Sequence, residues 1–353
     1  MQVYRLQLPA CPHHVVFRIC AASAQCIGFS FSVLQQQLPP SGARVFIVGD
    51  SQRGQTIFEQ HLAAAAGMQR PPQLLLHLGD TAQRPNIDGD WDQRFFGPLK
   101  RSRLLLPLLL VQGNHDSFTE ANASAAAGIG ATVQAGSAEH VMVNPSLLSY
   151  QGTGAWLSTY FATTVAGVRW IVLDTNMRDL QQLQVSPPLP PSPRNALTRT
   201  LQWLRNELQS AAAAAANFRV VCMHIPPWIE FWDVESWGDC APEGSCDKAY
   251  PLYVRTHILP IIVGGGVDVV MSGHQHNYQR GMYGGVVFVT SGGGGGGLDL
   301  NRVDNHSVYT VTRTRHHHLL LHISGSSLAF TAVQLDGSTL DQFEVQRRQA
   351  AKG

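Results

Sequence analysis

Charged residues are scarce in this chain, because Asp, Glu, Lys and Arg together make up only 14% of its 353 residues. The formal net charge is +1, so the chain as a whole has no charge of one sign that would attract nucleic acid or an anionic membrane surface. Apolar residues make up 44%, and a chain of this length can bury the core of one large domain or two ordinary ones. Partners must therefore be inferred from local sites.

Cysteine is also scarce, and its six residues are too few and too scattered for a disulfide scaffold. Cys240 and Cys246 would close a small loop in an oxidising compartment, and two free thiols are the equally weighted alternative. Cys222 lies inside an apolar run, which predicts a buried and inert thiol.

Acidic residues are missing from the start of the chain, where the first carboxylate is Asp50. Residues 1–40 combine Arg5 and Arg18 with a long uncharged stretch, which predicts a targeting leader, secretory in preference to organellar, with a disordered tail as the alternative. No segment reaches the ~20 consecutive apolar residues that a membrane-spanning helix needs. No change of composition follows, so we expect residues 41–353 to form a single domain, with an unknown oligomeric state.

Short apolar runs that end in polar residues dominate the remaining chain. Two of them, at residues 45–48 and 74–78, end in Gly-Asp at Asp50 and Asp80. A third, at residues 104–111, leads into Gly113-Asn114-His115-Asp116. Together with helical composition at residues 56–66, these runs predict buried strands alternating with helices, an α/β fold.

Further elements follow from composition and turn residues. Helices are expected at residues 91–99 and 196–216, and a hairpin at 156–161 and 168–173. Strands are expected at residues 218–223, 267–271 and 285–290, and at 317–323, 328–335 and 340–346, the last two joined by a turn at Asp336-Gly337.

Oxygen and imidazole side chains recur at the ends of these predicted strands, which α/β sheets bring to one edge. The set consists of Asp50, Asp80, Asn114, His115, His224, His274 and His276. It exceeds what one tetrahedral zinc needs, and it suits two Zn, Mn or Fe ions that share a carboxylate. Two ions about 3.5–4 Å apart can lower the pKa of a bridging water and orient a phosphoryl group for in-line attack, so hydrolysis of phosphate esters is the resulting hypothesis.

These motifs, taken in order, resemble those of the calcineurin-like metallophosphoesterases. The motifs are Gly-Asp at 49–50 and 79–80, Gly-Asn-His-Asp at 113–116, His224 after an apolar run, and Gly-His-Gln-His at 273–276. The sequences of residues 91–98, 201–208, 223–227 and 276–280 are more similar to the purple acid phosphatase-like branch of this family. The resemblance covers about residues 43–346. It implies a four-layer α/β sandwich, two mixed β-sheets flanked by helices, that acts on phosphomonoesters in preference to phosphodiesters or nucleotides.

The resemblance also implies a role for each residue. Asp80 would bridge two divalent or trivalent ions of Fe, Mn or Zn. Asp50 and His276 would hold the first ion, and Asn114, His224 and His274 the second. His115 would contact the scissile phosphate and protonate the leaving group, a task that suits an imidazole near neutral pH. Asp116 would support His115 or its loop.

Two positions depart from the family pattern. Many relatives have His where this chain has Gln52, and purple acid phosphatases have a metal-binding Tyr where it has Gln83. An amide oxygen of Gln52 or Gln83, or a water, can take the missing place, so we expect a weaker and more labile first ion. Without that Tyr there is no tyrosinate-to-iron colour, and a ferric first ion is less favoured.

Other interpretations stay open. The fold could serve a non-catalytic binding protein whose first ion site is impaired, and a remote alternative is an esterase that uses Ser51 in its Gly-Asp-Ser motif. His316, His317 and His318 are expected at the surface. The glycine run at 292–297 lacks the Lys-Ser/Thr of a phosphate-binding loop and is expected to be a flexible loop near the site. Four aromatic residues after His224 either wall the substrate cleft or cap the sheet edge: Trp228, Phe231, Trp232 and Trp237.

Overall fold

The computed structural model of the chain describes residues 14–20, 26–32, 42–83, 89–104, 106–117, 160–175, 196–232 and 249–348. Within these ranges the strands form two large sheets and one separate hairpin. The predictions for Cys240, Cys246 and Trp237 lie outside the described residues.

The first large sheet has six strands in the order β15-β14-β13-β3-β4-β5. Its strands are β3 (Ala43–Val48), β4 (Leu74–His77), β5 (Leu108–Leu110), β13 (His317–Ile323), β14 (Ser327–Gln334) and β15 (Thr339–Gln346). Strands β3, β4 and β5 are parallel, whereas β13, β14 and β15 run antiparallel to their neighbours. The predicted turn at Asp336-Gly337 is confirmed, with Gly337 at a φ of +81°.

The second large sheet has seven strands in the order β12-β10-β11-β9-β8-β7-β6. Its strands are β6 (Phe161–Val165), β7 (Val168–Val172), β8 (Phe218–Cys222), β9 (Val269–Ser272), β10 (Tyr278–Tyr283), β11 (Val286–Ser291) and β12 (Tyr309–Arg313). Strands β7, β8, β9 and β11 are parallel, and the other three pair antiparallel at the two sides.

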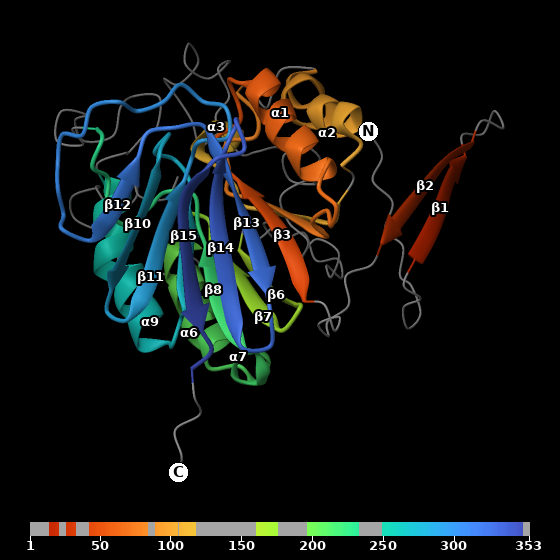
Figure 1. Cartoon of the computed structure of the whole chain (residues 1–353). Helices are drawn as coiled ribbons and strands as arrows, with labels where there is room; N and C mark the ends of the chain where they lie inside the picture. Colours follow the sequence, from red (N-terminus) through yellow and green to blue (C-terminus); the bar gives the residue numbers. More distant parts are fainter. Residues whose placement is uncertain are drawn as a thin grey trace, which may run out of the picture.

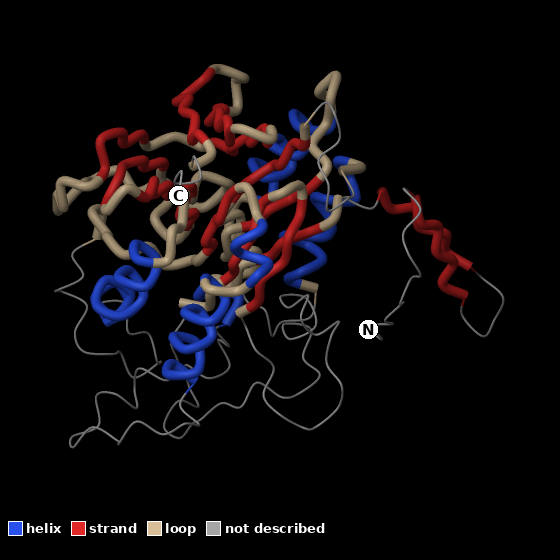
Figure 2. Tube along the Cα trace, turned by 90° about the horizontal axis from the view of Figure 1, so that it is seen from below, coloured by secondary structure: helices blue, strands red, loops and turns tan. Residues whose placement is uncertain are grey.

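Helices cover the outer face of each sheet (Figure 1). On the six-stranded side they are α1 (Gln55–Ala66), the π-helical turn η1 (Asp92–Phe96) and α2 (Gly97–Ser102). On the seven-stranded side they are α6 (Ala196–Leu208), α7 (Ala211–Ala215), α8 (Ala249–Tyr253), η4 (Val254–Ile258) and α9 (Leu259–Gly264). Seen from below, these helices fall into two groups on opposite sides of the strands (Figure 2). A short helix, α3 (Asn114–Ser117), follows β5.

Alternate residues of the central strands explain why their apolar runs are continuous. In β3, Val45 and Ile47 face the core between the sheets, while Phe46 and Val48 pack with Phe58 of α1 on the outer face. A strand covered on both faces needs apolar side chains at every position, not only at alternate ones. The molecule therefore has four layers, helix, sheet, sheet and helix, and the predicted fold class is confirmed.

Two predicted elements differ in detail. The expected helix at residues 196–216 is two helices, and Ser210 caps the second by accepting a hydrogen bond from the N–H of Ala213 at 3.1 Å. A side-chain oxygen at this position satisfies a backbone donor that a helix start leaves free. The hairpin joined through Ala166-Gly167 is present, but its first strand, β6, lies at Phe161–Val165, closer to the turn than expected.

The expected surface position of the three consecutive histidines is wrong. His317 and His318 are fully buried at the start of β13, and His316 is half-buried. The error arises because both faces of β13 are covered, and the ring of His317 contacts that of Tyr278 in the second sheet. His318 faces α1, where its Nδ1 lies 3.0 Å from Nδ1 of His61.

Strands β1 (His14–Cys20) and β2 (Cys26–Ser32) pair with each other and with neither large sheet. This hairpin lies inside the predicted leader, which stays a prediction. Among the described helices, none combines the length and the apolar character required to cross a bilayer.

Candidate metal centre

The polar residues that follow the parallel strands meet at one edge of the sandwich. Asp50, Asp80 and Asn114 follow β3, β4 and β5 of one sheet, and His224, His274 and His276 follow β8 and β9 of the other. The backbone N–H of Asp50 donates to the carbonyl of Gly79 at 3.0 Å, and that of Gly273 to the carbonyl of His224 at 3.0 Å. The carboxyl ends of parallel strands are the usual place for ligand sites in α/β proteins.

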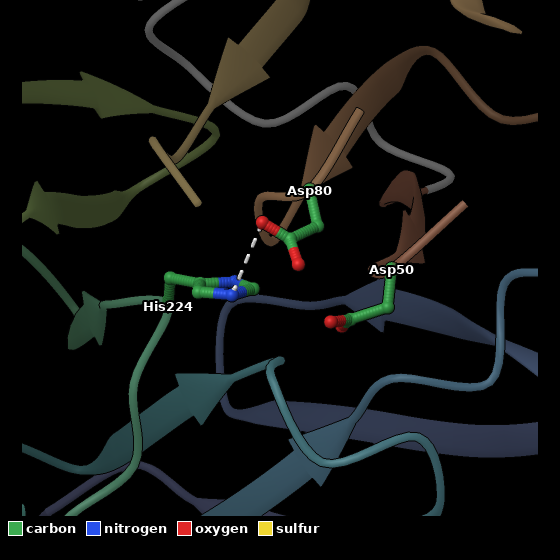
Figure 3. Close-up of side chains that lie close together, drawn as sticks. All are labelled: Asp50, Asp80 and His224. Atoms are coloured by element: carbon green, nitrogen blue, oxygen red, sulfur yellow. Dashed lines mark ion pairs between the residues drawn. The ribbon is translucent and has the colours of Figure 1, made fainter. Parts of the chain in front are cut away.

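Three buried side chains form the centre of this cluster. One ligand atom from each of Asp50, Asp80 and His224 lies within 4.8 Å of the other two. Figure 3 shows the three side chains, from different strand ends, pointing toward a common space. The Nε2 atom of His224 lies 3.4 Å from Oδ1 of Asp80.

The two oxygens of Asp80 face opposite sides of the cluster. Oδ1 accepts a hydrogen bond from the backbone N–H of His115 at 2.8 Å and faces His224. Oδ2 accepts a hydrogen bond from Nε2 of Gln52 at 3.0 Å. Asp80 therefore stands between two groups of donor atoms, which is the arrangement that a bridging carboxylate requires.

One group of donors centres on the amide oxygen of Asn114. Its Oδ1 lies 3.0 Å from Nε2 of His224 and 2.9 Å from Nδ1 of His274. Nδ1 of His224 lies 2.8 Å from the carbonyl oxygen of Leu78, which leaves Nε2 directed at Asp80 and Asn114. A backbone carbonyl that binds one ring nitrogen fixes the orientation of a metal-binding histidine.

The other group of donors centres on Asp50. Both of its carboxylate oxygens accept from the backbone N–H of His274, at 2.9 and 3.0 Å. Nε2 of His276 lies 3.6 Å from Oδ1 of Asp50, while its Nδ1 lies 2.6 Å from the carbonyl oxygen of Gly297. His276 is thus oriented by a backbone carbonyl in the same way as His224.

Glycines let the loops that carry these side chains approach one another closely. A Cβ on Gly113 would lie 2.1 Å from the backbone nitrogen of Asp80, and one on Gly273 would lie 2.5 Å from Oδ2 of Asp50. Asp50, Asp80 and His274 themselves have φ of 59°, 56° and 71°, in the left-handed region that L-residues rarely adopt. Strained conformations of this kind are typical of functional sites.

The charges of the cluster are strongly perturbed. Burial, with the negative charge of Asp80 adding to it, raises the pKa of Asp50 well above its usual value. Burial also disfavours the ionised form of Asp80, but the neighbouring His224 and His115 hold its pKa below the usual value. Burial opposes the charged form of His224 as well, yet Asp80 prevails and raises the pKa of His224 to about 10. In the protein by itself, an ionised Asp80 is therefore paired with a protonated His224.

The chemistry of these donors fits metal ions. Two buried side-chain atoms here, Oε1 of Gln52 and Nε2 of His274, have no hydrogen-bond partner within the described part of the chain. Buried polar atoms are normally paired, so unpaired ones on the carboxamide and imidazole side chains of this cluster fit residues that bind a metal ion. Mixed oxygen and nitrogen donors of this kind suit Zn, Mn or Fe.

His115, predicted to act on the substrate, lies at the same edge. It is half-buried in α3, and its backbone N–H is bound to Oδ1 of Asp80. Asp116 supports the loop, because its carboxylate accepts hydrogen bonds from the N–H groups of Asp80, Thr81, Ala82 and Gly113.

Sequence reasoning missed two contributions to the site. Asp299, which we gave no role, accepts a hydrogen bond from the N–H of His276 at 2.7 Å. The glycine run at 292–297, expected to be flexible, is buried over 292–296, and Gly294 and Gly296 donate to the carbonyls of Gly49 and Asp50 at 2.9 and 2.7 Å. In the sequence, the run of consecutive glycines is the one signal that indicates such close packing of one backbone segment on another.

The aromatic residues after His224 divide between the two expected roles. Trp228 packs in the core of the seven-stranded sheet against Tyr283, Phe288 and Tyr309, so it caps that sheet. Trp232 lies edge-on to the ring of His274 with centroids 4.6 Å apart, so it borders the site. Phe231 is buried.

The esterase alternative finds no support in the position of Ser51. Its hydroxyl is fully buried and lies 3.0 Å from Nε2 of His77, which is also fully buried. A nucleophile must reach its substrate, and this hydroxyl is closed off from one.

Comparison with known proteins adds independent findings. A family model described as calcineurin-like phosphoesterase matches residues 43–278. The human serine/threonine-protein phosphatase CPPED1 is 28% identical over 211 residues, which cover 59% of this chain and 53% of that protein. The bovine protein of the same name is 27% identical over 186 residues, which cover 53% and 46%. The chain thus spans about half the length of the curated relatives it matches.

Solved structures support the fold. The purple acid phosphatase PPD1 from yellow lupin seeds matches with a TM-score of 0.67 at 16% identity, covering 95% of this chain and 59% of that one. GAP50, the anchor in the inner membrane complex of Plasmodium, matches with a TM-score of 0.57 at 15% identity, covering 88% and 90%. At such identities the likeness concerns the fold alone.

Proposed function

The chain belongs to the calcineurin-like phosphoesterase family, and from that premise we propose that it hydrolyses phosphate monoesters with the help of two metal ions. The observation that carries the proposal is the position of Asp80. Its Oδ1 lies 3.4 Å from Nε2 of His224, and one of its oxygens lies within 4.8 Å of a ligand atom of Asp50, so one carboxylate is within reach of both groups of donors.

The donors divide into two sets around this carboxylate. Asp50, Asp80 and His276 would hold the first ion, and Asp80, Asn114, His224 and His274 the second. Ions so held supply Lewis-acid polarisation of the phosphoryl oxygens and an activated water for in-line attack. The carbonyls of Leu78 and Gly297 bind Nδ1 of His224 and His276, which supports a role for the Nε2 atoms of these two rings as metal ligands.

His115 would hold and deliver the proton in this scheme. Its backbone N–H is bound to Oδ1 of Asp80, which supports a position for His115 beside the proposed ions. Its imidazole would protonate the leaving-group oxygen as the bond from that oxygen to phosphorus breaks.

The substrate class is favoured by the relatives. Curated relatives are named serine/threonine-protein phosphatases, so phosphoserine and phosphothreonine in peptides are the first substrates to test. Trp232, beside His274, offers an apolar surface for the group that carries the phosphate.

The test compares p-nitrophenyl phosphate, bis(p-nitrophenyl) phosphate and phosphoserine peptides as substrates of protein purified without chelators. Faster turnover of the monoesters, lost with a chelator and restored by Mn²⁺, Zn²⁺ or Fe²⁺, supports the proposal. Diester turnover that exceeds monoester turnover would move the function to phosphodiester hydrolysis.

The competing function is a non-catalytic binding protein, and two observations favour it. Glutamine stands at both positions, 52 and 83, where relatives carry a His or a Tyr ligand. GAP50, which shares the fold, is described as an anchor. Absence of turnover on every ester at any added ion, together with one bound ion or none, would support this alternative.

A further inference from the structure

Two glutamines lie near the first ion position, and the structure separates their roles. Gln52 is fully buried, whereas Gln83 is half-buried. Oε1 of Gln83 accepts a hydrogen bond from Nε of the exposed Arg53 at 3.0 Å. Its amide oxygen is therefore engaged at the surface.

Gln52 differs in both atoms of its amide. Nε2 donates to Oδ2 of Asp80 at 3.0 Å, and Oε1 is buried without a hydrogen-bond partner among the described residues. The described part of the polypeptide therefore binds the nitrogen of this amide and supplies no donor to its buried oxygen, so the oxygen can take a metal ion as its partner.

The backbone of Gln52 is held in place, whereas its side-chain amide can rotate about the bond that joins it to the rest of the side chain. Nη1 of Arg94 donates to the backbone carbonyl of Gln52, and Nε of Arg94 is paired with Asp90 at 2.6 Å. The side-chain amide is flat, so half a turn exchanges the positions of Oε1 and Nε2 with little change in packing. That turn directs the oxygen toward the side of Asp80 that faces away from His224.

We propose that Gln52 completes the first metal position through its side-chain oxygen, an inference that rests on the proposed two-ion function. The first set then consists of three residues that offer oxygen, Asp50, Asp80 and Gln52, and one that offers nitrogen, His276. The second set has two oxygen and two nitrogen donors. Oxygen donors suit Mn²⁺ better than Zn²⁺, so the first position prefers Mn²⁺ more strongly than the second does.

The test measures bound ions and affinities in the folded full-length protein by calorimetric titration with Mn²⁺ and Zn²⁺. Wild type binds two equivalents of Mn²⁺. Gln52→Ala binds one equivalent tightly, and the other is weakened by at least about tenfold or lost. Gln83→Ala, the matched control, keeps both at wild-type affinity.

Gln52→His gives a second measure, which does not depend on removing the side chain. An imidazole in place of the amide raises the affinity of one equivalent for Zn²⁺ relative to Mn²⁺. Two equivalents at wild-type affinity in Gln52→Ala, or an unchanged preference in Gln52→His, overturn the proposal. Wild type that binds fewer than two ions would instead overturn the proposed function, so the two failures are distinct.

Discussion

The carboxylate of Asp116 accepts a hydrogen bond at 2.9 Å from the backbone N–H of Asp80. The same carboxylate binds the N–H groups of Thr81 and Ala82, at 2.8 and 3.0 Å, and that of Gly113, at 2.8 Å. One buried side chain thereby joins the loop after β4, which carries Asp80, to the loop after β5, which carries Asn114 and His115.

Replacing Asp116 by Ala should destabilise the protein and loosen the site. The change leaves four buried N–H groups without their acceptor, and each such group costs about 1–3 kcal/mol. We expect a loss of at least about 3 kcal/mol in the free energy of unfolding, measured by denaturant titration. The exposed Asp92 serves as a control, because Asp92→Ala should stay within about 0.5 kcal/mol. Equal stabilities of the two variants would refute this role of Asp116.

His115→Ala should separate catalysis from metal binding. A positioned general acid contributes about a hundredfold or more to the rate, so kcat on p-nitrophenyl phosphate should fall by that factor. The bound metal should stay at the wild-type level, because no metal donor is removed. His257→Ala, at an exposed histidine of η4, is the control and should keep wild-type turnover. Wild-type turnover in His115→Ala would end the proposed role of this residue.

Two neighbouring glycines provide a matched pair. A Cβ on Gly296 would lie 2.6 Å from the ring of His276, whereas one on Gly297 would meet nothing within 4 Å. Gly296→Ala should therefore displace His276 and weaken the binding of one ion by about tenfold or more, while Gly297→Ala should leave both unchanged. The measurement is calorimetric titration with Mn²⁺, and similar affinities in the two variants would contradict the packing described.

The buried pair His61 and His318 should make the protein sensitive to acid. Burial, aided by the neighbouring histidines, lowers the pKa of His61 to about 2 and that of His318 to about 3, from an ordinary 6.5. Below pH 6.5 the unfolded chain binds protons that the folded chain does not, so stability is full above that pH and falls as the pH drops toward 3.

Each of these histidines adds a slope of about 1.4 kcal/mol per pH unit below its unfolded-state pKa. His61→Gln should remove one such contribution and flatten the decline in unfolding free energy between pH about 6 and about 5. Denaturant titrations across this range measure the slope. Identical slopes in wild type and His61→Gln would show that His61 does not stay neutral in the folded protein.

The strands and their polar ends were accessible from the sequence because they depend on local pattern. The run at residues 45–48 is apolar at every position because both faces of β3 are covered, and Gly-Asp follows where the strand reaches the sheet edge. The four-layer arrangement was predicted from the family resemblance alone, because the hydrophobic pattern of a strand does not indicate which other strands pair with it. The pairing of β13 with β3, across more than half of the chain, is an example.

The remaining features depend on long-range packing and could not be predicted. His317 and His318 are buried because Tyr278 of the second sheet and His61 of α1 cover the two faces of β13, and nothing in three consecutive histidines indicates that. The roles of Asp299 and of Gly297 as partners of His276 arise from a loop more than twenty positions away in sequence. The sequence left Gln52 and Gln83 as equal candidates, and their burial and partners distinguish them.

The most direct test counts metal ions per chain in wild type and in Asp80→Asn, by mass spectrometry, alongside turnover of p-nitrophenyl phosphate. We expect two ions and metal-dependent turnover in wild type. In Asp80→Asn, which loses the shared carboxylate, we expect the loss of both ions and of turnover. One ion or none in wild type, with no turnover at any added metal, would contradict the proposed two-ion hydrolysis.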